Sequence, residues 1–201
     1  MKNIAIFASG SGTNFQSIVD SVKNGLLNAN IRLLVCDNPN AFVLERAKNE
    51  KIPIFVFSSK DYTSKAEYEK DILHQLQKQE VEFIVLAGYM RLIGKTLLKP
   101  FEGKIVNIHP SLLPLFPGKN AVEQALEAGV SETGVTIHYV DEGMDTGPII
   151  EQRVIPIAKS DTKPMVLDKI KRVEHELYPN VLRKLLNNHQ EENHAKKTCN
   201  H

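Results

Sequence analysis

Short runs of apolar and β-branched residues alternate with longer amphipathic segments through the first half of the chain. The runs predict strands at Asn3–Ala8, Ile31–Cys36, Pro53–Phe57, Glu82–Ala87 and Lys104–Ile108. The segments between them predict helices at Thr13–Lys23, Ala41–Asn49, Lys65–Gln79 and Leu92–Leu98. Because the strands are apolar on both faces and helix-length segments join them, we expect an α/β fold. The predicted architecture is a Rossmann-like, doubly wound, mostly parallel sheet with helices on both faces.

The second half of the chain has a different pattern. The segment Ile108–Gly118 contains three prolines and predicts no regular element. A helix is predicted over Ala121–Ala128, and strands over Gly134–Val140 and Ile149–Pro156. A long helix follows from Thr162, and Pro179 is expected to bend or interrupt it. Its apolar positions are Ile170, Val173, Leu177, Val181 and Leu185.

Neither an internal repeat nor a Gly/Ser-rich linker divides the chain. We therefore expect a single domain over residues 1–188. The sequence turns polar from Asn187, and we expect residues 189–201 to form a polar, disordered tail.

Composition and charge exclude several classes of protein. The 201 residues include 25 Lys+Arg and 24 Asp+Glu, a balance that gives no reason to expect nucleic acid or a membrane as partner. The longest apolar run, Phe83 to Met90, is far shorter than the ~20 residues of a membrane helix. Two cysteines, Cys36 in an apolar run and Cys199 near the end, cannot form a disulfide framework. We expect a cytoplasmic protein.

The segment Ser9–Asn14 joins the first predicted strand to the first helix and contains two glycines. Backbone amides at a helix N-terminus bind anions, so the loop indicates a phosphate site, with Thr13 and Asn14 capping the helix or donating to the phosphate. A dinucleotide site is a narrower hypothesis, in which Asp37 would bind a ribose. Phe15, however, stands where that motif requires a small residue. A purely structural turn remains an alternative for the loop, and an ordinary turn remains one for Asp37.

Asn107 and His109 are two residues apart near the end of a predicted strand, so both side chains point to the same face. The carboxyl end of a parallel strand is where α/β sheets bind ligands. An amide beside an imidazole suits oxyanion stabilisation with proton transfer. The alternative is that both side chains cap the strand end by bonding to loop backbone.

Asp145 lies in a loop between two glycines, Gly143 and Gly147. Its carboxylate either holds His109 and keeps it protonated or makes a turn. A metal site formed by His109, His138 and Asp145 is conceivable. No close ligand pair such as His-x-x-x-His supports it, and we expect no metal.

Four segments of the chain together match a known family. They are Ser9–Asn14, Ala87–Arg91, Asn107–Pro114 and Asp141–Pro148. In this order and at these spacings the chain resembles the folate-dependent formyltransferases, and among them the enzymes that formylate glycinamide ribonucleotide in de novo purine synthesis. The resemblance runs from about Asn3 to Leu186. The Asn-x-His-Pro-Ser-Leu-Leu-Pro segment is shared across the wider superfamily, so the N-terminal loop and the compact length indicate the substrate.

The resemblance implies roles for particular residues. Asn107, His109 and Asp145 would be catalytic, and the ribonucleotide would be bound by Gly12, Thr13, Asn14 and Glu174. The implied folate-binding residues are Lys65, Met90, Arg91, Leu92, Ile93, Asn107, Asp141, Glu142, Gly143 and Met144. Many members carry a histidine-bearing loop where this chain reads Lys119-Asn120-Ala121, so the role of that histidine does not transfer.

The implied reaction moves the formyl group of the co-substrate 10-formyltetrahydrofolate to the amine of glycinamide ribonucleotide, without a metal. The implied partners are these two small molecules, with no nucleic acid and no membrane, and the protein would be a monomer or homodimer. Three alternatives are distinguishable. A methionyl-tRNA formyltransferase would carry a further C-terminal domain and a basic surface, and a formyltetrahydrofolate deformylase would carry an N-terminal regulatory domain. A nucleotide-binding module would bind phosphate at the glycine loop without transferring formyl.

Overall fold

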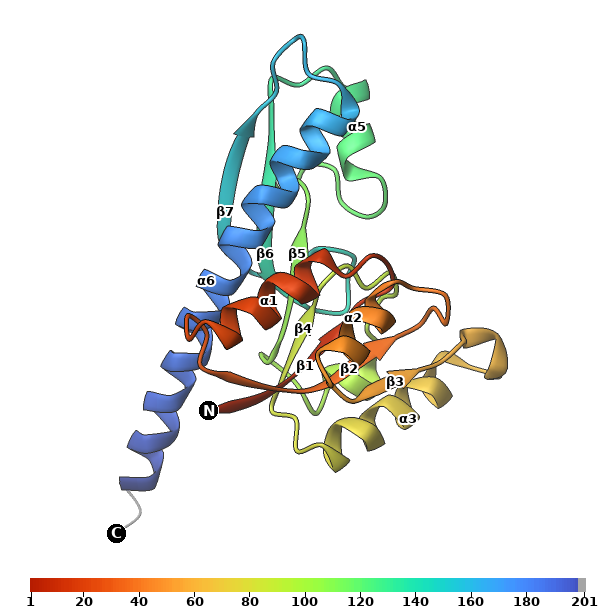
Figure 1. Cartoon of the computed structure of the whole chain (residues 1–201), viewed down its shortest axis with the longest axis vertical. Helices are drawn as coiled ribbons and strands as arrows, with labels where there is room; N and C mark the ends of the chain where they lie inside the picture. The colour runs from red at the N-terminus through yellow and green to blue at the C-terminus, as the bar shows by residue number, and fades with distance from the viewer. Residues whose placement is uncertain (199–201) are drawn as a thin grey trace.

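The computed structural model describes residues 1–198, and the side chains up to residue 187. Within these residues one sheet forms in the order β3-β2-β1-β4-β5-β6-β7. Strands β1 to β5 pair in parallel, whereas β6 runs antiparallel to both β5 and β7 (Figure 1). The strands are β1 (Lys2–Phe7), β2 (Ala29–Cys36), β3 (Ile54–Val56), β4 (Phe83–Leu86), β5 (Ile105–His109), β6 (Glu132–Tyr139) and β7 (Ile149–Pro156). The predicted doubly wound, mostly parallel fold is confirmed.

The helices connect the strands as expected, with two differences. They are α1 (Thr13–Lys23), α2 (Val43–Asn49), α3 (Lys65–Lys78), α4 (Lys95–Leu98), α5 (Ala121–Glu127) and α6 (Lys163–Thr198). A short 3-10 helix, η1 (Ser59–Asp61), precedes α3 and was not predicted. The helix predicted from Leu92 begins only at Lys95, because residues 89–94 form an irregular loop.

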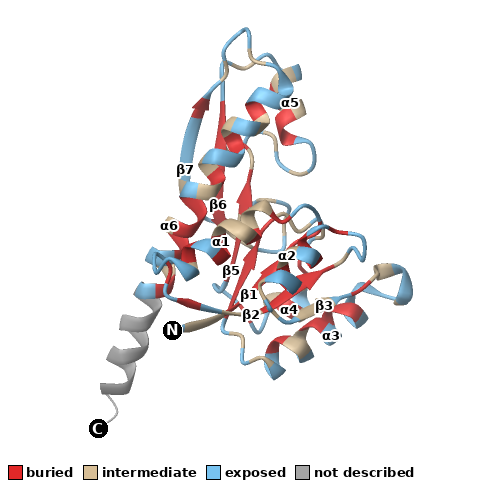
Figure 2. Ribbon diagram, viewed as in Figure 1, coloured by how far each residue is buried: buried red, intermediate tan, exposed pale blue. Residues whose placement is uncertain are grey.

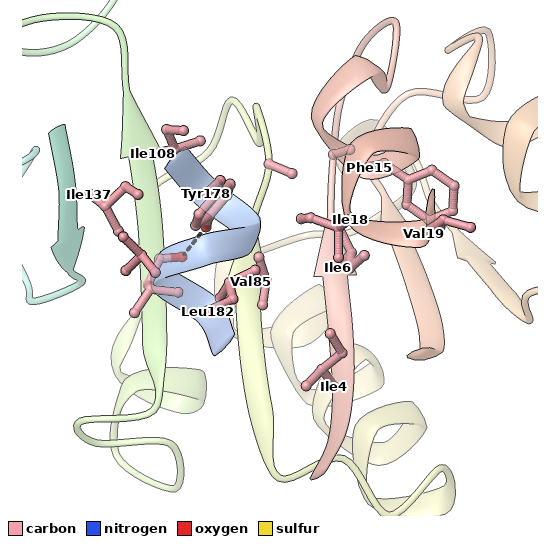
Figure 3. Close-up of a cluster of buried hydrophobic side chains, with 14 of the residues drawn as sticks. Ile4, Ile6, Phe15, Ile18, Val19, Val85, Ile108, Ile137, Tyr178 and Leu182 are labelled. Atoms are coloured by element: carbon pink, nitrogen blue, oxygen red, sulfur yellow. Dashed lines mark hydrogen bonds between the residues drawn. The ribbon is translucent and has the colours of Figure 1, made fainter. Parts of the chain in front are cut away.

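Alternate residues of each central strand pack into two separate hydrophobic cores. On β1, Ile4 and Ile6 face the core under α1 and α6, whereas Ala5 and Phe7 face the core under α3 and α4. Figure 2 shows the resulting buried sheet between exposed helix faces. Figure 3 shows α6 packing Tyr178 and Leu182 against β4, β5 and β6, where the Tyr178 hydroxyl lies 2.8 Å from the carbonyl oxygen of Leu86. The sheet ends that form the cleft described below are therefore supported from both faces.

Pro179 was predicted to bend or interrupt α6; the helix continues through it, so the interruption is wrong and the bend stays a prediction. Proline has no N–H, and the carbonyl of His175, four residues earlier, consequently loses its usual helical partner. The hydroxyl of Ser17 on α1 donates a 2.8 Å hydrogen bond to this carbonyl instead. The packing of α1 on α6 thus satisfies the group that the proline leaves unpaired.

Replacing Ser17 with alanine is expected to lower the free energy of unfolding by about 1–2 kcal/mol, because the His175 carbonyl loses its partner. Chemical denaturation measures this change. Asn180→Ala is the matched control, since Asn180 donates to the exposed carbonyl of Glu176 and its loss should change stability by less than about 0.5 kcal/mol. Equal, small effects of both variants would contradict the explanation.

The predicted polar tail begins near the end of the described side chains. Helix α6 is assigned to Thr198, and residues 199–201, with Cys199 among them, lie outside the described residues. The domain boundary at residue 188 and the disorder of the tail therefore stay predictions. Cys36 is fully buried at the end of β2, as its apolar neighbours predict. No helix within residues 1–198 has the length and apolarity needed to cross a lipid bilayer.

Candidate active site

A cleft of about 700 Å³ opens at the carboxyl ends of β4 and β5. The winding of the sheet reverses between β1 and β4, and such a switch point is where doubly wound sheets bind ligands. The loops after β4 and β5, the loop between β6 and β7, and one side of α6 form its walls. Its lining brings together four residues singled out in the sequence: Asn107, His109, Asp145 and Glu174.

Asn107 and His109 lie on the same face of β5, as their spacing predicts. The antiparallel neighbour β6 places His138 directly opposite Asn107. His109 is 5% exposed and His138 is 2% exposed. The polar groups at this end of β5 are therefore largely removed from water, where electrostatic interactions are stronger.

Asp145 reaches the ends of both predicted catalytic side chains. Its Oδ2 lies 3.3 Å from Nδ1 of His109, and its Oδ1 accepts a 3.3 Å hydrogen bond from Nδ2 of Asn107. The backbone N–H of Gly118 also donates to Oδ2, at 2.7 Å. Asp145 itself adopts a left-handed conformation, with φ of 56°. The two roles left open by the sequence, a turn and a partner for His109, are thus both filled by this residue.

The loop that carries Asp145 is held close to the end of β6. Tyr139 donates its N–H to the carbonyl of Pro148 at 2.9 Å. A Cβ added at Gly147 would lie 1.9 Å from the Tyr139 carbonyl oxygen, so only glycine permits this approach. Gly147, two residues after Asp145, therefore allows the loop to lie against the end of β6.

The imidazole of His109 lies between two oxygen acceptors. Nε2 is 2.8 Å from the carbonyl oxygen of Phe116, and Nδ1 faces Asp145. A carbonyl and a carboxylate oxygen only accept, so the ring donates to both only when both nitrogens carry protons. The contact with Phe116 is the strand-end capping considered above as an alternative, and it coexists with the contact to Asp145.

The carboxylate of Asp145 stays ionised in this half-buried position. Burial tends to raise its pKa, but the neighbouring imidazole of His138, 3.6 Å away, the N–H of Gly118 and the charge of His109 outweigh burial and hold the pKa below its ordinary value. A negative charge is thus maintained beside the two imidazoles.

His138 was considered in the sequence only as a metal ligand, yet it belongs to this cluster. Its Nδ1 is 2.8 Å from the carbonyl oxygen of Tyr139, which makes Nδ1 the donor. Nε2 then accepts from Nδ2 of Asn107 at 3.2 Å and fixes the orientation of that amide. His138 is identified by its position opposite Asn107 in the sheet, a long-range pairing that the local sequence does not encode.

Among the side chains that the structure describes, no group of three His, Cys, Asp or Glu is arranged to hold a metal ion.

The glycine loop supports the start of α1 differently from the prediction. Gly12 is the N-cap, with φ of 71°, and neither Thr13 nor Asn14 caps the helix with its side chain. A Cβ at Gly12 would lie 2.4 Å from Cγ2 of Val43, so packing against α2 requires glycine here whatever the loop binds. Of the three predicted ribonucleotide residues in this loop, Asn14 lines the cleft, whereas Gly12 and Thr13 do not.

The dinucleotide hypothesis finds no support in this geometry. Phe15 is fully buried in the core. Both oxygens of the Asp37 carboxylate have protein partners, namely the hydroxyl of Ser9 at 2.5 Å and Nε of Arg91 at 2.6 Å. Asp37 is therefore engaged within the protein instead of facing a ribose.

Glu174 of α6 meets the glycine loop at one end of the cleft. Its Oε2 accepts a 3.0 Å hydrogen bond from Nδ2 of Asn14. Burial raises the pKa of Glu174, against the opposing effects of Asn14 and Lys171. Oδ1 of Asn14 is buried without a hydrogen-bond partner. A polar ligand that donates a hydrogen bond here would satisfy this oxygen.

The loop after β4 forms the opposite wall of the cleft. Met90 and Leu92 are exposed at its rim, whereas Ile93 is buried. Within the described residues, no hydrogen bond joins the backbone N–H groups of Arg91, Leu92 and Ile93 to the protein. An apolar rim with free backbone donors suits a flat heteroaromatic ring that carries polar edges.

Most predicted folate residues lie on this wall or on the facing loop, which contributes Asp141, Gly143 and Met144. Two others lie outside the lining. Nζ of Lys65 is 3.9 Å from Glu69, and Glu142 pairs with Lys95 at 3.6 Å. Lys119, Glu123 and Lys163 also line the cleft, and sequence reasoning assigned them no role there.

A half-buried amide and carboxylate beside a buried imidazole in a cleft of this kind suit an enzyme that stabilises an oxyanion and moves a proton, the chemistry of acyl-group transfer. The chain belongs to the formyl transferase family, whose pattern matches residues 2–182.

Individual relatives resemble this chain over most of its length. The phosphoribosylglycinamide formyltransferase of Bacillus subtilis is 55% identical over 186 residues, which cover 92% of this chain and 95% of that protein. The solved structure of glycinamide ribonucleotide transformylase 1 from Geobacillus kaustophilus has a TM-score of 0.91 and 64% identity, and covers 92% of this chain and 99% of that one. The trifunctional purine biosynthetic protein adenosine-3 of Drosophila melanogaster is 38% identical, and the chain spans 14% of its length.

Proposed function

We propose that the chain transfers the formyl group of 10-formyltetrahydrofolate to the amine of glycinamide ribonucleotide, giving the N-formyl product and tetrahydrofolate in purine biosynthesis. The names of the Bacillus and Geobacillus relatives support formyl transfer to glycinamide ribonucleotide, and the formyl transferase family match supports the folate donor. The observation that carries the mechanism is the contact of Asp145 with both Asn107 and His109. Following the resemblance, the proposed oligomeric state is a monomer or a homodimer. Its proposed place is the cytoplasm.

The reaction begins when the substrate amine attacks the formyl carbon. A carbon–nitrogen bond forms, and the carbonyl electron pair moves to oxygen as an oxyanion. Asn107 and protonated His109 donate hydrogen bonds to this oxygen. Both donors now make 3.3 Å contacts with Asp145, which are long enough to yield to a stronger acceptor. The shorter hydrogen bonds, from the N–H of Gly118 to Asp145 and from His109 to the carbonyl of Phe116, keep the two side chains in position.

The second half of the reaction moves one proton and breaks one bond. The attacking nitrogen becomes an ammonium and must lose a proton, whereas N10 of the folate must gain one as it leaves. Asp145 accepts the first proton through a water molecule and returns it to N10 as the oxyanion re-forms the carbonyl and the bond from the formyl carbon to N10 breaks. No covalent enzyme intermediate is required.

Glycinamide ribonucleotide binds at the other end of the cleft. Its phosphate lies at the N-terminus of α1, beside Gly12, Thr13 and Asn14, where backbone amides and the helix dipole favour an anion. The ribose hydroxyls lie at Glu174 and at the unpaired oxygen of Asn14. The folate ring lies along residues 90–93 and the loop over 141–145.

One assay tests the proposal as a whole. The purified chain is incubated with glycinamide ribonucleotide and 10-formyltetrahydrofolate, and release of tetrahydrofolate is followed. Release that requires both substrates is expected. Release without the ribonucleotide would indicate a deformylase, and binding of the ribonucleotide without any release would indicate a binding module.

Replacing Thr13 with aspartate tests the phosphate site without disturbing the fold. A carboxylate in the first turn of α1 favours the helix dipole, so stability should not fall, but the charge repels the phosphate. We expect the KM for glycinamide ribonucleotide to rise at least about tenfold, while the affinity for tetrahydrofolate stays unchanged. Thr13→Asn is the neutral control. Gly12→Val cannot serve because it clashes with Val43. A rise shared by both variants would contradict the electrostatic account.

A further inference from the structure

The proposed mechanism assigns no role to one buried carboxylate near the cleft, that of Asp37. Asp37 follows β2, and its side chain is 8% exposed. It lies behind the wall that the loop after β4 forms, and it does not line the cleft itself. A buried charge is costly unless it is fully paired, so its partners indicate what it does.

Those partners connect three separate strand ends. Ser9, at the end of β1, donates its hydroxyl to Oδ1 of Asp37 at 2.5 Å and accepts the backbone N–H of Met90 at 2.9 Å. Arg91 donates Nε to Oδ2 of Asp37 at 2.6 Å. Strands β2, β1 and β4 are adjacent in the sheet (Figure 1), so the network spans the switch point beneath the cleft.

The network fixes the segment that the proposed folate site uses. Ser9 also donates its N–H to the carbonyl of Gly88 at 3.1 Å. At the far end of the same loop, the buried carboxylate of Glu69 accepts the N–H of Gly94 at 2.6 Å. The backbone between these anchors, which contains Arg91, Leu92 and Ile93, is therefore held at both ends while its own donors stay free for a ligand.

We propose that Asp37, acting through Ser9 and Arg91, is the positioning residue that presents the backbone of residues 90–93 to the folate co-substrate. This inference rests on the proposed function. Its physical basis is preorganisation, since a loop ordered in advance spends less of the binding free energy on being ordered. Asp37 touches neither substrate, so its effect is on folate binding and not on the reacting atoms.

Beyond Ser9, the glycine loop is held by contacts that do not involve Asp37, which makes the two sites separable. Val43 donates its N–H to the carbonyl of Gly10 at 3.1 Å, and Arg46 donates Nε to the carbonyl of Ser11 at 2.8 Å. Loss of Asp37 leaves both of these contacts intact. Loss of Arg46 leaves the network of Asp37 intact.

The test compares Asp37→Ala with Arg46→Met in steady-state kinetics with both substrates. Asp37→Ala is expected to raise the KM for 10-formyltetrahydrofolate, and the Kd for tetrahydrofolate, at least about tenfold, with the KM for the ribonucleotide changing less than about twofold. Arg46→Met is expected to give the reverse split. Asp37→Asn keeps an acceptor for Arg91 but not for the hydroxyl of Ser9, so it should restore part of the folate affinity.

Asp37→Asn also serves if the alanine variant does not fold. A wild-type enzyme that transfers formyl, together with folded Asp37 variants whose folate KM and tetrahydrofolate Kd stay within about twofold of wild type, would overturn the inference alone. A wild type that transfers no formyl would overturn the proposed function, and tetrahydrofolate binding to Asp37→Asn would then still decide the positioning role. Equal losses of affinity for both substrates in Asp37→Asn would also overturn the inference, because they would indicate a general structural role for Asp37.

Discussion

Asp145→Asn is expected to lower turnover by at least about 100-fold, within the ~10²–10⁴-fold range of proton-transfer contributions. Asparagine keeps the size of the side chain and tolerates the left-handed backbone at this position, where φ is 56°. It removes the negative charge that faces His109 and the group that accepts the proton. Turnover of the variant is measured beside its affinity for glycinamide ribonucleotide, which should stay near that of wild type because the proposed contacts lie at Asn14 and Glu174.

Two controls distinguish the loss of the carboxylate charge from a loss of structure in the loop. The melting temperature shows whether the loop survives, since the N–H of Gly118 now needs the remaining amide oxygen as its acceptor. Asp141→Asn changes a carboxylate of the same loop that accepts from Gly143 and Thr146 and has no contact with His109, so a smaller loss is expected. Near-normal turnover of Asp145→Asn would remove Asp145 from the mechanism.

His109→Gln is expected to reduce kcat by at least about 100-fold, the size of losing one oxyanion donor. The glutamine amide can still donate to the carbonyl of Phe116, as Nε2 of the histidine does, so the segment after β5 should keep its place. It cannot carry a positive charge, and the transition state loses its charged donor. Steady-state kinetics should therefore show a fall in kcat with both KM values little changed.

His138→Gln is the matched comparison for this variant. His138 is equally buried, but it acts on Asn107 and lies farther from Asp145, at 3.6 Å. A smaller fall in kcat is expected, because Asn107 loses only the partner that orients its amide. If the two variants were equally impaired, the distinction between a donor and an orienting residue would be wrong.

The sequence predicted most of the fold because its signals are local. The bounds of α1 and β7 agree with the predictions at both ends, and each element is flanked by glycine or proline. The prediction for α4 was wrong at its start, because the apolar residue Leu92 is exposed at the cleft rim and does not face a helix-packing surface. In a sequence, the apolar side chains of a ligand site cannot be distinguished from those of a buried core.

The candidate site was predictable only where its residues share one strand or one loop. The spacing of Asn107 and His109 places both on one face of β5 without further information. The partnership of Asn107 with His138 depends on the register between β5 and β6, and the continuity of α6 depends on Ser17 of a different helix. Such contacts join residues far apart in sequence, so no local pattern encodes them.

The antiparallel pairing of β6 with β5 also has a consequence for how this enzyme and its relatives can diverge. Because β5, β6 and the loop after β6 are consecutive, every proposed acid–base group falls within the single stretch from Asn107 to Asp145. The groups proposed to choose the acceptor, at the glycine loop and on α6, lie outside that stretch on both sides. Substitutions that alter which amine is accepted can therefore accumulate without touching the chemistry, so that one reaction is inherited as a block while its acceptors change around it.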